Sequence, residues 1–176
     1  MFLKGAITAL VTPMKENGDL DFESLENLIN FQIESGVSGI VAVGTTGESA
    51  TIDFKDHMRL IEAFVKISNK RIPIIAGTGA NSTEEAITLT KSAESSGADA
   101  ALLVSPYYNK PPQEGIYEHH IKIADEVNLP QILYNVPSRT ASFIESETVS
   151  RLAKHQNIIG IKDATGDMEN LENLKT

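Results

Sequence analysis

Six short apolar runs recur along the chain at intervals of roughly 30 residues, the length of a strand-helix-strand unit. The runs are GAITALV (5–11), GIVAVG (39–44), IPIIAG (72–77), ADAALLV (98–104), LPQILY (129–134) and NIIGI (157–161). Their apolar residues are continuous rather than alternating. This pattern is typical of strands that are covered on both faces, as in a parallel sheet.

Amphipathic segments lie between these runs and predict helices. Residues 21–36 carry apolar side chains at helical spacing and end at Gly36, a typical C-terminal cap. Ser82 and Glu85 form a capping-box pattern at the start of another segment. The predicted helices are 21–36, 53–69, 81–97, 113–127 and 145–154, and GDMENLENLKT (166–176) begins one more.

Strands that alternate with helices predict an α/β fold, for which two architectures compete. A doubly wound open sheet suits the length of 176 residues, because a (β/α)8 barrel normally takes about 250. The residues that follow the strands favour the barrel. They are Thr12-Pro13, GTTGES, GTGANS, SPYYN, Tyr134-Asn135 and Lys162-Asp163. In a barrel, polar residues at the carboxyl ends of the strands form one ring around one site. In an open sheet, a ligand binds mainly at the point where the strand order reverses, so most of these polar ends would have no role in binding.

Composition narrows the classes of function. The net charge of −9 argues against binding to nucleic acid or to an anionic membrane. The absence of cysteine excludes disulfides, thiolate metal sites and a cysteine nucleophile. No apolar stretch approaches the roughly 20 residues that span a bilayer, and MFLKGAITALVTPM resembles a strand more than a signal peptide, so we expect a cytoplasmic protein.

Lys162 ends a wholly apolar strand, and two interpretations are open. Such a lysine commonly turns into solvent. Alternatively, burial in a barrel mouth disfavours its ammonium form, lowers its pKa and frees the amine to attack a carbonyl as a Schiff-base nucleophile. Tyr134 ends the preceding strand, and in a barrel that strand would lie beside the strand of Lys162. The Tyr134 hydroxyl either bonds to a backbone group or carries protons for imine chemistry.

Other motifs carry weaker signals. GTTGES (44–49) lacks the Gly-Lys-Ser/Thr of a phosphate loop, but its backbone N–H groups and threonine hydroxyls can bind a small carboxylate at the start of a helix. Ser49 lacks the frame of a nucleophile elbow. His57, His119, His120 and His155 have no metal-ligand spacing, so no metal site is expected, and we interpret them as lying on solvated helix faces.

Four motifs together resemble the family of dihydrodipicolinate synthase and N-acetylneuraminate lyase, which are pyruvate-dependent class I aldolases. The motifs are GTTGES after the second strand, PYYNKP after the fourth, YNVPSRT at the fifth and GIKDATG at the sixth. The resemblance extends from residue 2 to residue 176. It implies a (β/α)8 TIM barrel, of which residues 1–176 would form about the first six βα units.

The resemblance also implies a catalytic set. Lys162 would form an imine with pyruvate, so that no metal or organic cofactor is needed. Tyr134, Thr45 and Tyr108 would form the proton relay, with Tyr108 supplied by the neighbouring subunit of a tight dimer. Thr46 would hold the pyruvate carboxylate.

The second substrate implied by the resemblance is aspartate semialdehyde. Arg139 would bind its carboxylate, because the guanidinium fork suits bidentate contact. The product would be 4-hydroxy-tetrahydrodipicolinate, in lysine and diaminopimelate biosynthesis. Thr45-Thr46 and YNVPSRT favour the synthase branch of the family, with N-acetylneuraminate lyase and other sugar-acid aldolases as alternatives.

Regulation and assembly are implied in the same way. A feedback site for lysine at the dimer interface has counterparts in Ser49, Ala50, His57, Asn81, Glu85 and Tyr107. Phe54 departs from its pattern, since many sensitive members have histidine there. These residues could equally cap helices and pack an interface. The expected assembly is a homotetramer, a dimer of dimers.

The length departs from the family, whose domain continues for two more βα units and a helical region. We therefore expect a C-terminally truncated barrel that ends within the helix after the sixth strand. The alternative function is a catalytically inactive fragment or an assembly module.

Overall fold

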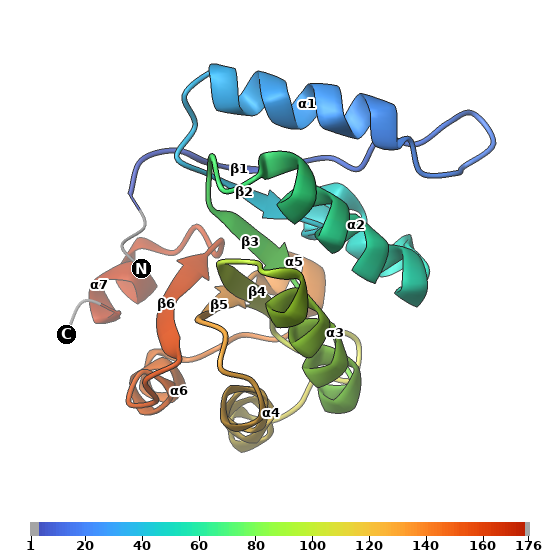
Figure 1. Cartoon of the computed structure of the whole chain (residues 1–176). Coiled ribbons are helices and arrows are strands. Elements are labelled where there is room, and N and C mark those ends of the chain that lie inside the picture. Colours follow the sequence, from blue (N-terminus) through green and yellow to red (C-terminus); the bar gives the residue numbers. More distant parts are fainter. Residues whose placement is uncertain (1–3, 175–176) are drawn as a thin grey trace. The chain divides into compact units, whose positions relative to one another are not determined.

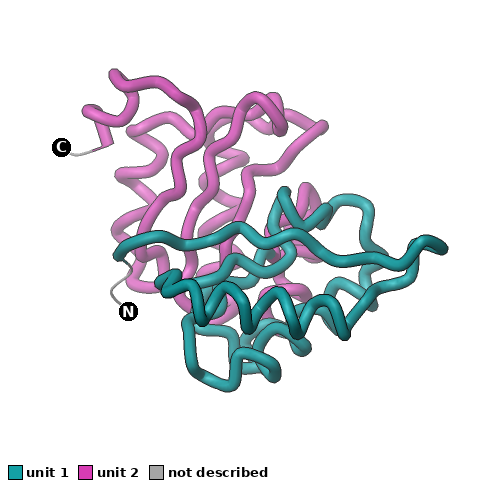
Figure 2. The backbone as a smooth tube through the Cα atoms, turned by 90° about the horizontal axis from the view of Figure 1, so that it is seen from above, with its two compact units in different colours: residues 1–77, 92–100 teal, residues 78–91, 101–176 magenta. Residues whose placement is uncertain are grey.

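The computed structural model describes residues 4–174, and its elements are shown in Figure 1. The chain divides into two compact units, as Figure 2 shows. Residues 1–77 and 92–100 form the first unit, and residues 78–91 and 101–176 form the second. The two units are described separately below.

The first unit contains three parallel strands, β1 (Ile7–Ala9), β2 (Gly39–Ala42) and β3 (Ile74–Gly77). Strand β2 pairs with both others, with Ile7 opposite Gly39 and Ile40 opposite Ile74. Helices α1 (Phe22–Glu34) and α2 (Phe54–Ser68) pack against each other, and α2 also contacts β2 and β3. Leu25, Ile29, Leu60, Ile61 and Phe64 on these helices are almost completely buried.

Local chemistry sets the ends of both helices. The side chain of Asp21 accepts a hydrogen bond from Ser24 N at 3.0 Å, and that of Asp53 accepts one from Lys55 N at 2.9 Å. Such caps satisfy backbone donors that have no partner inside a helix. Helix α2 ends at Asn69, whose backbone is left-handed with φ 46°.

The second unit contains the parallel strands β5 (Gln131–Asn135) and β6 (Ile158–Asp163) and all but the first residue of β4 (Ala100–Val104). Strand β5 lies between β4 and β6. Its helices are α4 (Gln113–Glu126), α5 (Pro137–Thr140), α6 (Ser146–Leu152) and α7 (Met168–Asn173), and α3 (Thr83–Ser96) begins in this unit.

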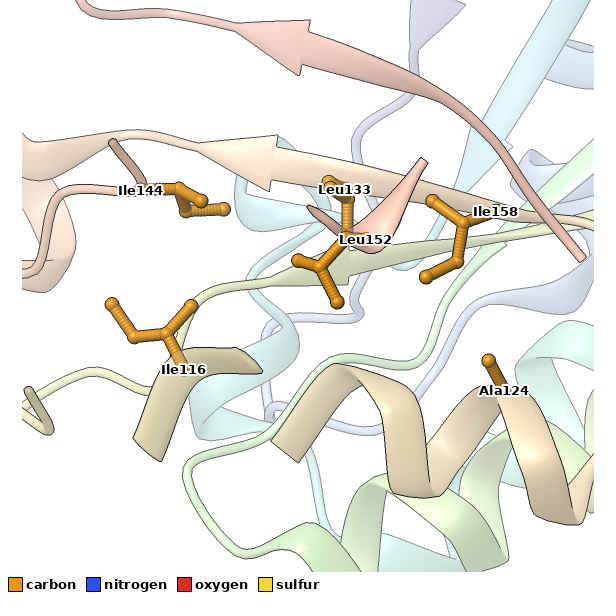
Figure 3. Close-up of a cluster of buried hydrophobic side chains, with 6 residues drawn as sticks. All are labelled: Ile116, Ala124, Leu133, Ile144, Leu152 and Ile158. Carbon is orange, nitrogen blue, oxygen red and sulfur yellow. The ribbon is translucent and has the colours of Figure 1, made fainter. Parts of the chain in front are cut away.

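A cluster of apolar side chains joins β5 and β6 to helices α4 and α6 (Figure 3). It comprises Ile116, Ala124, Leu133, Ile144, Leu152 and Ile158. Full burial of an isoleucine or leucine contributes about 1.5–3 kcal/mol relative to exposure. The cluster therefore anchors the helical layer to the strands that carry Tyr134 and Lys162.

The six predicted strands and the predicted helices are confirmed, with three corrections. First, β6 extends to Asp163 rather than ending at 161, so Lys162 is part of the strand. Second, GTTGES does not open a helix directly. It forms the 3-10 turns η1 (Thr45–Gly47) and, in part, η2 (Ser49–Thr51), which precede α2.

Third, continuous burial is wrong for the first and sixth strands. The residues of β1 are only partly buried, and Ile159 of β6 is 40% exposed, whereas every residue of β2, β3 and β5 is buried. Among the described residues β1 pairs only with β2, and β6 only with β5. A strand with a single partner leaves one edge open to solvent.

In the part of the chain that the structure describes, no helix is long and apolar enough to cross a membrane.

Candidate active site

The carboxyl ends of β5 and β6 bring two candidate catalytic side chains together. Tyr134 lies opposite Lys162, and Asn135 lies opposite Asp163. Lys162 Nζ is 4.3 Å from the centroid of the Tyr134 ring. An ammonium over an aromatic face contributes about 0.5–2 kcal/mol, depending on its desolvation. The Tyr134 ring, itself 7% exposed, therefore holds the amine at a defined position.

A bulge in β6 produces this pairing. Gln131 pairs with Ile158, but the next residue, Ile132, pairs with Gly160, so that Ile159 has no partner of its own in the ladder. A regular ladder from Gln131 onward would place Ile161 opposite Tyr134. One extra residue in a strand exchanges the two faces of everything that follows, because side chains alternate with a period of two.

Lys162 is half-buried, between the solvent-facing and the buried lysine that the sequence left open. The reason lies in β6, which has β5 as its single strand partner in the described chain. Tyr134 covers one side of the Lys162 side chain, while the opposite edge of β6 is open.

Asn135 and Asp163 form a second row beside the first. The Asn135 side chain is fully buried; its Nδ2 donates to Ile144 O at 3.2 Å, and its Oδ1 accepts from Ile144 N at 3.1 Å. Asp163 accepts hydrogen bonds from Thr165 and Asn170. Both side chains bond to segments that follow the strands, so they fix the loops around Tyr134 and Lys162. The sequence placed these polar residues at strand ends but did not indicate this role.

Arg139 lies in the short helix α5, directly after β5. Its side chain is exposed, and it forms no ion pair within residues 4–174. The segment around it is fixed by Thr140, whose hydroxyl accepts from Ser142 N at 3.1 Å, and by Ala141, which ends the helix at φ 53°. A guanidinium without an internal partner is available for a carboxylate ligand.

Tyr107 and Tyr108 follow β4. Tyr108 is 90% exposed and has φ 74°, a left-handed conformation that is uncommon for a bulky residue. Tyr107 is half-buried; burial and, second, the negative charge of Glu85 raise the pKa of its phenol. Asn81 Nδ2 donates to Tyr107 O at 3.2 Å. The structure therefore brings together three of the residues predicted for the lysine site, namely Asn81, Glu85 and Tyr107.

Thr45 and Thr46 lie in the first unit, in the turn η1 that follows β2, and both are exposed. Val43, two residues before Thr45, is buried and has φ 52°, which is an outlier for a β-branched residue. Gly77 packs against it so closely that an added Cβ would lie 2.4 Å from Val43 O. These contacts, with the Thr12 hydroxyl donating to Gly47 O at 2.7 Å, hold the loop from both ends.

Ser49 and Ala50 continue this loop in η2, and Phe54 begins α2 at 37% exposure. His57 is one turn further along α2, where it is buried and its Nε2 donates to Gly77 O at 2.7 Å. Burial lowers the pKa of this imidazole, and the hydrogen bond opposes that effect. With Nε2 protonated, Nδ1 is an acceptor.

The expectation of solvated histidines is wrong at three of four positions. His57 and His119 are 5% exposed, and His120 is fully buried. A neutral imidazole can be buried when a ring nitrogen is hydrogen-bonded, as His119 Nδ1 is to the Thr83 hydroxyl at 2.9 Å. The helical period contained the signal, because His120 lies four residues from both Ile116 and Ala124 on the buried stripe of α4.

Within residues 4–174 no group of three or more histidine or acidic side chains is arranged to hold a metal ion.

Parallel strands alternating with helices, with a lysine and a tyrosine paired at two strand ends, define the class of partial (β/α) barrels with a candidate site at the carboxyl ends of the strands. The family model described as the Dihydrodipicolinate synthetase family matches residues 2–176. The chain belongs to this family.

Two curated relatives carry the name 4-hydroxy-tetrahydrodipicolinate synthase. The protein of Alcanivorax borkumensis is 56% identical over 173 residues, which cover 98% of this chain and 59% of the relative. That of Thermodesulfovibrio yellowstonii is 57% identical over 171 residues, covering 97% and 58%. The chain thus spans a little under six tenths of the length of these relatives.

Solved structures agree on the fold. The chloride-inhibited dihydrodipicolinate synthase of Acinetobacter baumannii, complexed with pyruvate, matches 99% of this chain with a TM-score of 0.96 and 54% identity, and 61% of that protein is covered. The enzyme of Cyanidioschyzon merolae with lysine bound matches 97% with a TM-score of 0.94 and 41% identity, covering 59% of its own length. The chain therefore has the fold of a partial TIM barrel, comprising about six βα units.

Proposed function

We propose that this site condenses pyruvate with aspartate semialdehyde to give 4-hydroxy-tetrahydrodipicolinate, a step in lysine and diaminopimelate biosynthesis that takes place in the cytoplasm. The observation that carries the proposal is the position of Lys162 Nζ, 4.3 Å from the Tyr134 ring at the paired ends of β5 and β6. The names of the relatives support the same reaction, and one relative was solved with pyruvate.

The chemistry begins at the lysine amine. The neutral amine of Lys162 attacks the keto carbon of pyruvate, and loss of water leaves an imine. The protonated imine withdraws electrons from the adjacent methyl group, which loses a proton to give an enamine. The enamine carbon then attacks the aldehyde carbon of the second substrate, whose oxygen takes up a proton. The amino group of that substrate next attacks the imine carbon, and the Lys162 amine leaves with a proton, which closes the ring and releases the product. Because the iminium is itself the electron sink, the proposed reaction needs no metal or organic cofactor.

The Tyr134 hydroxyl is proposed to move these protons. It belongs to the ring that contacts Lys162 Nζ, so the phenol and the reacting nitrogen lie in one neighbourhood. A positioned acid-base group contributes about 10²–10⁴-fold to such steps. Thr45 and Tyr108 are proposed to complete the relay by linking the Tyr134 hydroxyl to bulk water.

Two side chains are proposed to bind the substrate carboxylates. Thr46, exposed in the turn η1, is proposed to donate its hydroxyl to the pyruvate carboxylate. Arg139, exposed and without an ion pair within residues 4–174, is proposed to bind the carboxylate of aspartate semialdehyde. Bidentate pairing with the guanidinium would orient the aldehyde toward the enamine.

We further propose that Tyr108 acts in the site of a neighbouring subunit and that the assembly is a homotetramer of two tight dimers. The 90% exposure of Tyr108, in a strained left-handed conformation, supports this role, because backbone strain of this kind clusters at active sites and ligand contacts. One structural relative is described as a monomeric dihydrodipicolinate synthase variant.

Lysine is proposed as a feedback inhibitor that binds Ser49, Ala50, His57, Asn81, Glu85 and Tyr107. Support comes from the grouping of Asn81, Glu85 and Tyr107, and from the relative that was solved with lysine bound. The carboxylate of Glu85 would pair with a ligand ammonium. His57 would accept through Nδ1, since its Nε2 already donates to Gly77 O.

Reductive trapping tests the proposed chemistry. The purified chain is incubated with pyruvate and borohydride, which delivers hydride to the imine carbon and makes the adduct permanent. Mass spectrometry of peptides should then find the pyruvate-derived mass on Lys162 and lose it in Lys162→Arg. Lys154→Arg, a change of the same kind at an exposed lysine on the same unit, is the control. Labelling at another residue, or none in the folded chain, contradicts the proposal.

A further inference from the structure

The carboxylate of Asp163, the residue after Lys162, uses both oxygens to hold the segment that leads from β6 to α7. Oδ1 accepts from Thr165 N at 3.0 Å and from the Thr165 hydroxyl at 2.6 Å. Oδ2 accepts from Asn170 Nδ2 at 2.9 Å. Asn170 lies on α7 and is only 6% exposed. The proposed reaction assigns no step to this pair.

The start of α7 is itself fixed to the same network. Asp167 caps the helix by accepting from Glu169 N at 2.9 Å and from Asn170 N at 3.2 Å. Asp167 N in turn donates to the Thr165 hydroxyl at 3.1 Å. The network therefore connects the end of β6 to a capped helix through hydrogen bonds alone, without an ion pair.

Asp163 and Lys162 face opposite sides of β6, because consecutive side chains in a strand alternate. The Lys162 amine lies over the Tyr134 ring, while the Asp163 carboxylate bonds toward α7. Asp163 therefore does not touch the reacting atoms. It can act on Lys162 only through the backbone that the two residues share.

That backbone needs support, because β6 is held by one strand alone in the described chain. Ile159 and Gly160 are exposed, and the last ladder bond of the pair is donated by Ala164 N to Asn135 O at 2.9 Å. The side opposite β5 has no strand within residues 4–174. The hydrogen bonds that Asp163 accepts from Thr165 and Asn170 fix the end of β6 from the helical side.

We propose that Asp163 and Asn170 are positioning residues for Lys162: their hydrogen bond holds the end of β6 so that the amine stays over the Tyr134 ring and in reach of a keto acid. The inference rests on the proposed role of Lys162 as imine-forming nucleophile. A displacement of about 1 Å of a reacting group can cost about a hundredfold in rate, so small movements of this strand end matter.

Exchanging the two residues tests the hydrogen bond between Asp163 and Asn170 directly. Asn170→Asp sets two carboxylates in contact, and their repulsion breaks the link between β6 and α7. The double variant Asp163→Asn with Asn170→Asp restores it, because the amide of residue 163 accepts from Thr165 through oxygen and donates to the new carboxylate through nitrogen. Asn173→Asp is the matched control, since it adds the same charge to an exposed position on the same helix.

Two readouts are compared across the four proteins. The first is the rate at which pyruvate is trapped on Lys162 by borohydride, where amine and keto group lose water and the imine then gains hydride. The second is hydrogen exchange of peptides that cover 158–170. We expect Asn170→Asp to slow trapping at least tenfold and to speed exchange, the double variant to recover most of both, and Asn173→Asp to match the parent.

The outcomes separate the inference from the proposed function. If the parent chain is not labelled on Lys162, the proposed function fails, while exchange alone still reports whether the hydrogen bond orders the end of β6. If Asn170→Asp traps pyruvate at the parental rate, the positioning role is overturned, whatever exchange shows. Slow trapping that the double variant does not recover also overturns it.

A milder variant covers the case in which Asn170→Asp does not fold. Asn170→Ala removes the Nδ2 donor to Asp163 without adding a charge. We expect it to fold and to show a several-fold slower trapping rate. A parental trapping rate in this variant would overturn the inference.

Discussion

Lys162 lies opposite Tyr134 because β6 contains one more residue than the ladder needs, and Ile159 is that residue. The bulge turns the amine onto the face that carries the tyrosine ring, 4.3 Å from its centroid, and turns Asp163 toward α7. A single unpaired residue thus directs Lys162 toward the Tyr134 ring and Asp163 toward α7. Bulges next to functional sites re-aim side chains in this way.

Tyr134→Phe should slow turnover by about a hundredfold or more, the usual scale for a lost proton-transfer group. The ring contact with Lys162 is retained, so the fold should be unchanged. The measurements, made on a complete form of the protein, are the steady-state rate of condensation of pyruvate with aspartate semialdehyde and the melting temperature. Tyr117→Phe, at a ring that Arg151 covers at 3.9 Å, is the control and should be neutral. Near-normal turnover of Tyr134→Phe would make this tyrosine a packing residue.

Glu85→Ala should abolish or greatly weaken lysine binding, because a ligand ammonium would lose the carboxylate beside Tyr107. Titration calorimetry with lysine measures this. Glu84→Ala removes an identical exposed charge one residue away in the same helical turn and should leave binding unchanged. Equal affinities of the parent and Glu85→Ala would remove Glu85 from the proposed site.

Gly77→Ala should destabilise the first unit by about 1–3 kcal/mol, the usual cost of forcing an extra methyl group into a packed interior. The new Cβ would lie 2.4 Å from Val43 O and 3.0 Å from Gly44 Cα, so the loop that carries Thr45 must shift. Urea denaturation gives the free energy of unfolding. Gly160→Ala, where an added Cβ meets nothing within 4 Å, is the control. Comparable stabilities of the two variants would show that Val43 is free to move.

Acid should destabilise the second unit through two buried imidazoles. Burial lowers the pKa of His119 to about 4, and burial with the nearby His119 lowers that of His120 to about 3. The unfolded chain, with histidine pKa values near 6.5, binds these protons first. The stability is therefore fully present above pH 6.5 and falls by up to about 1.4 kcal/mol per pH unit for each imidazole as the pH drops toward the folded values.

Urea denaturation at pH 7 and pH 5 measures this effect. His120→Leu removes one titrating group, so its loss of stability between the two pH values should be smaller than that of the parent. His155→Gln is the control, because His155 is less buried and bonds to Asp125 at 3.3 Å. An equal loss in the parent and His120→Leu would contradict the assignment.

The 176-residue polypeptide by itself should condense pyruvate with aspartate semialdehyde at least about a hundredfold more slowly than a full-length relative. Ile159 is 40% exposed and Lys162 is half-buried, so water has access and the reacting groups are loosely fixed. Imine trapping is less demanding, since it needs only Lys162 and its immediate neighbours. The exposed edge of β6 should also promote aggregation.

A coupled assay on the chain of verified mass, beside a full-length synthase, measures this difference. Turnover similar to that of the relative would contradict the prediction. It would also imply that a second copy of the chain covers β6 from outside.

The sequence by itself determined the order of strands and helices and the presence of Lys162 and Tyr134 at neighbouring strand ends. These features depend on local periodicity and on residues close together in the chain, which a single sequence contains. Only the tertiary structure decided the bulge at Ile159, because register is set by pairing between segments that are some 30 residues apart.

The same reason explains the other differences. The burial of His119 and His120 and the bond between Asp163 and Asn170 depend on which elements pack together. Local pattern gives each residue a face of its own element. Whether that face meets another element, a hydrogen-bond partner or water is decided by contacts that form only when the chain folds.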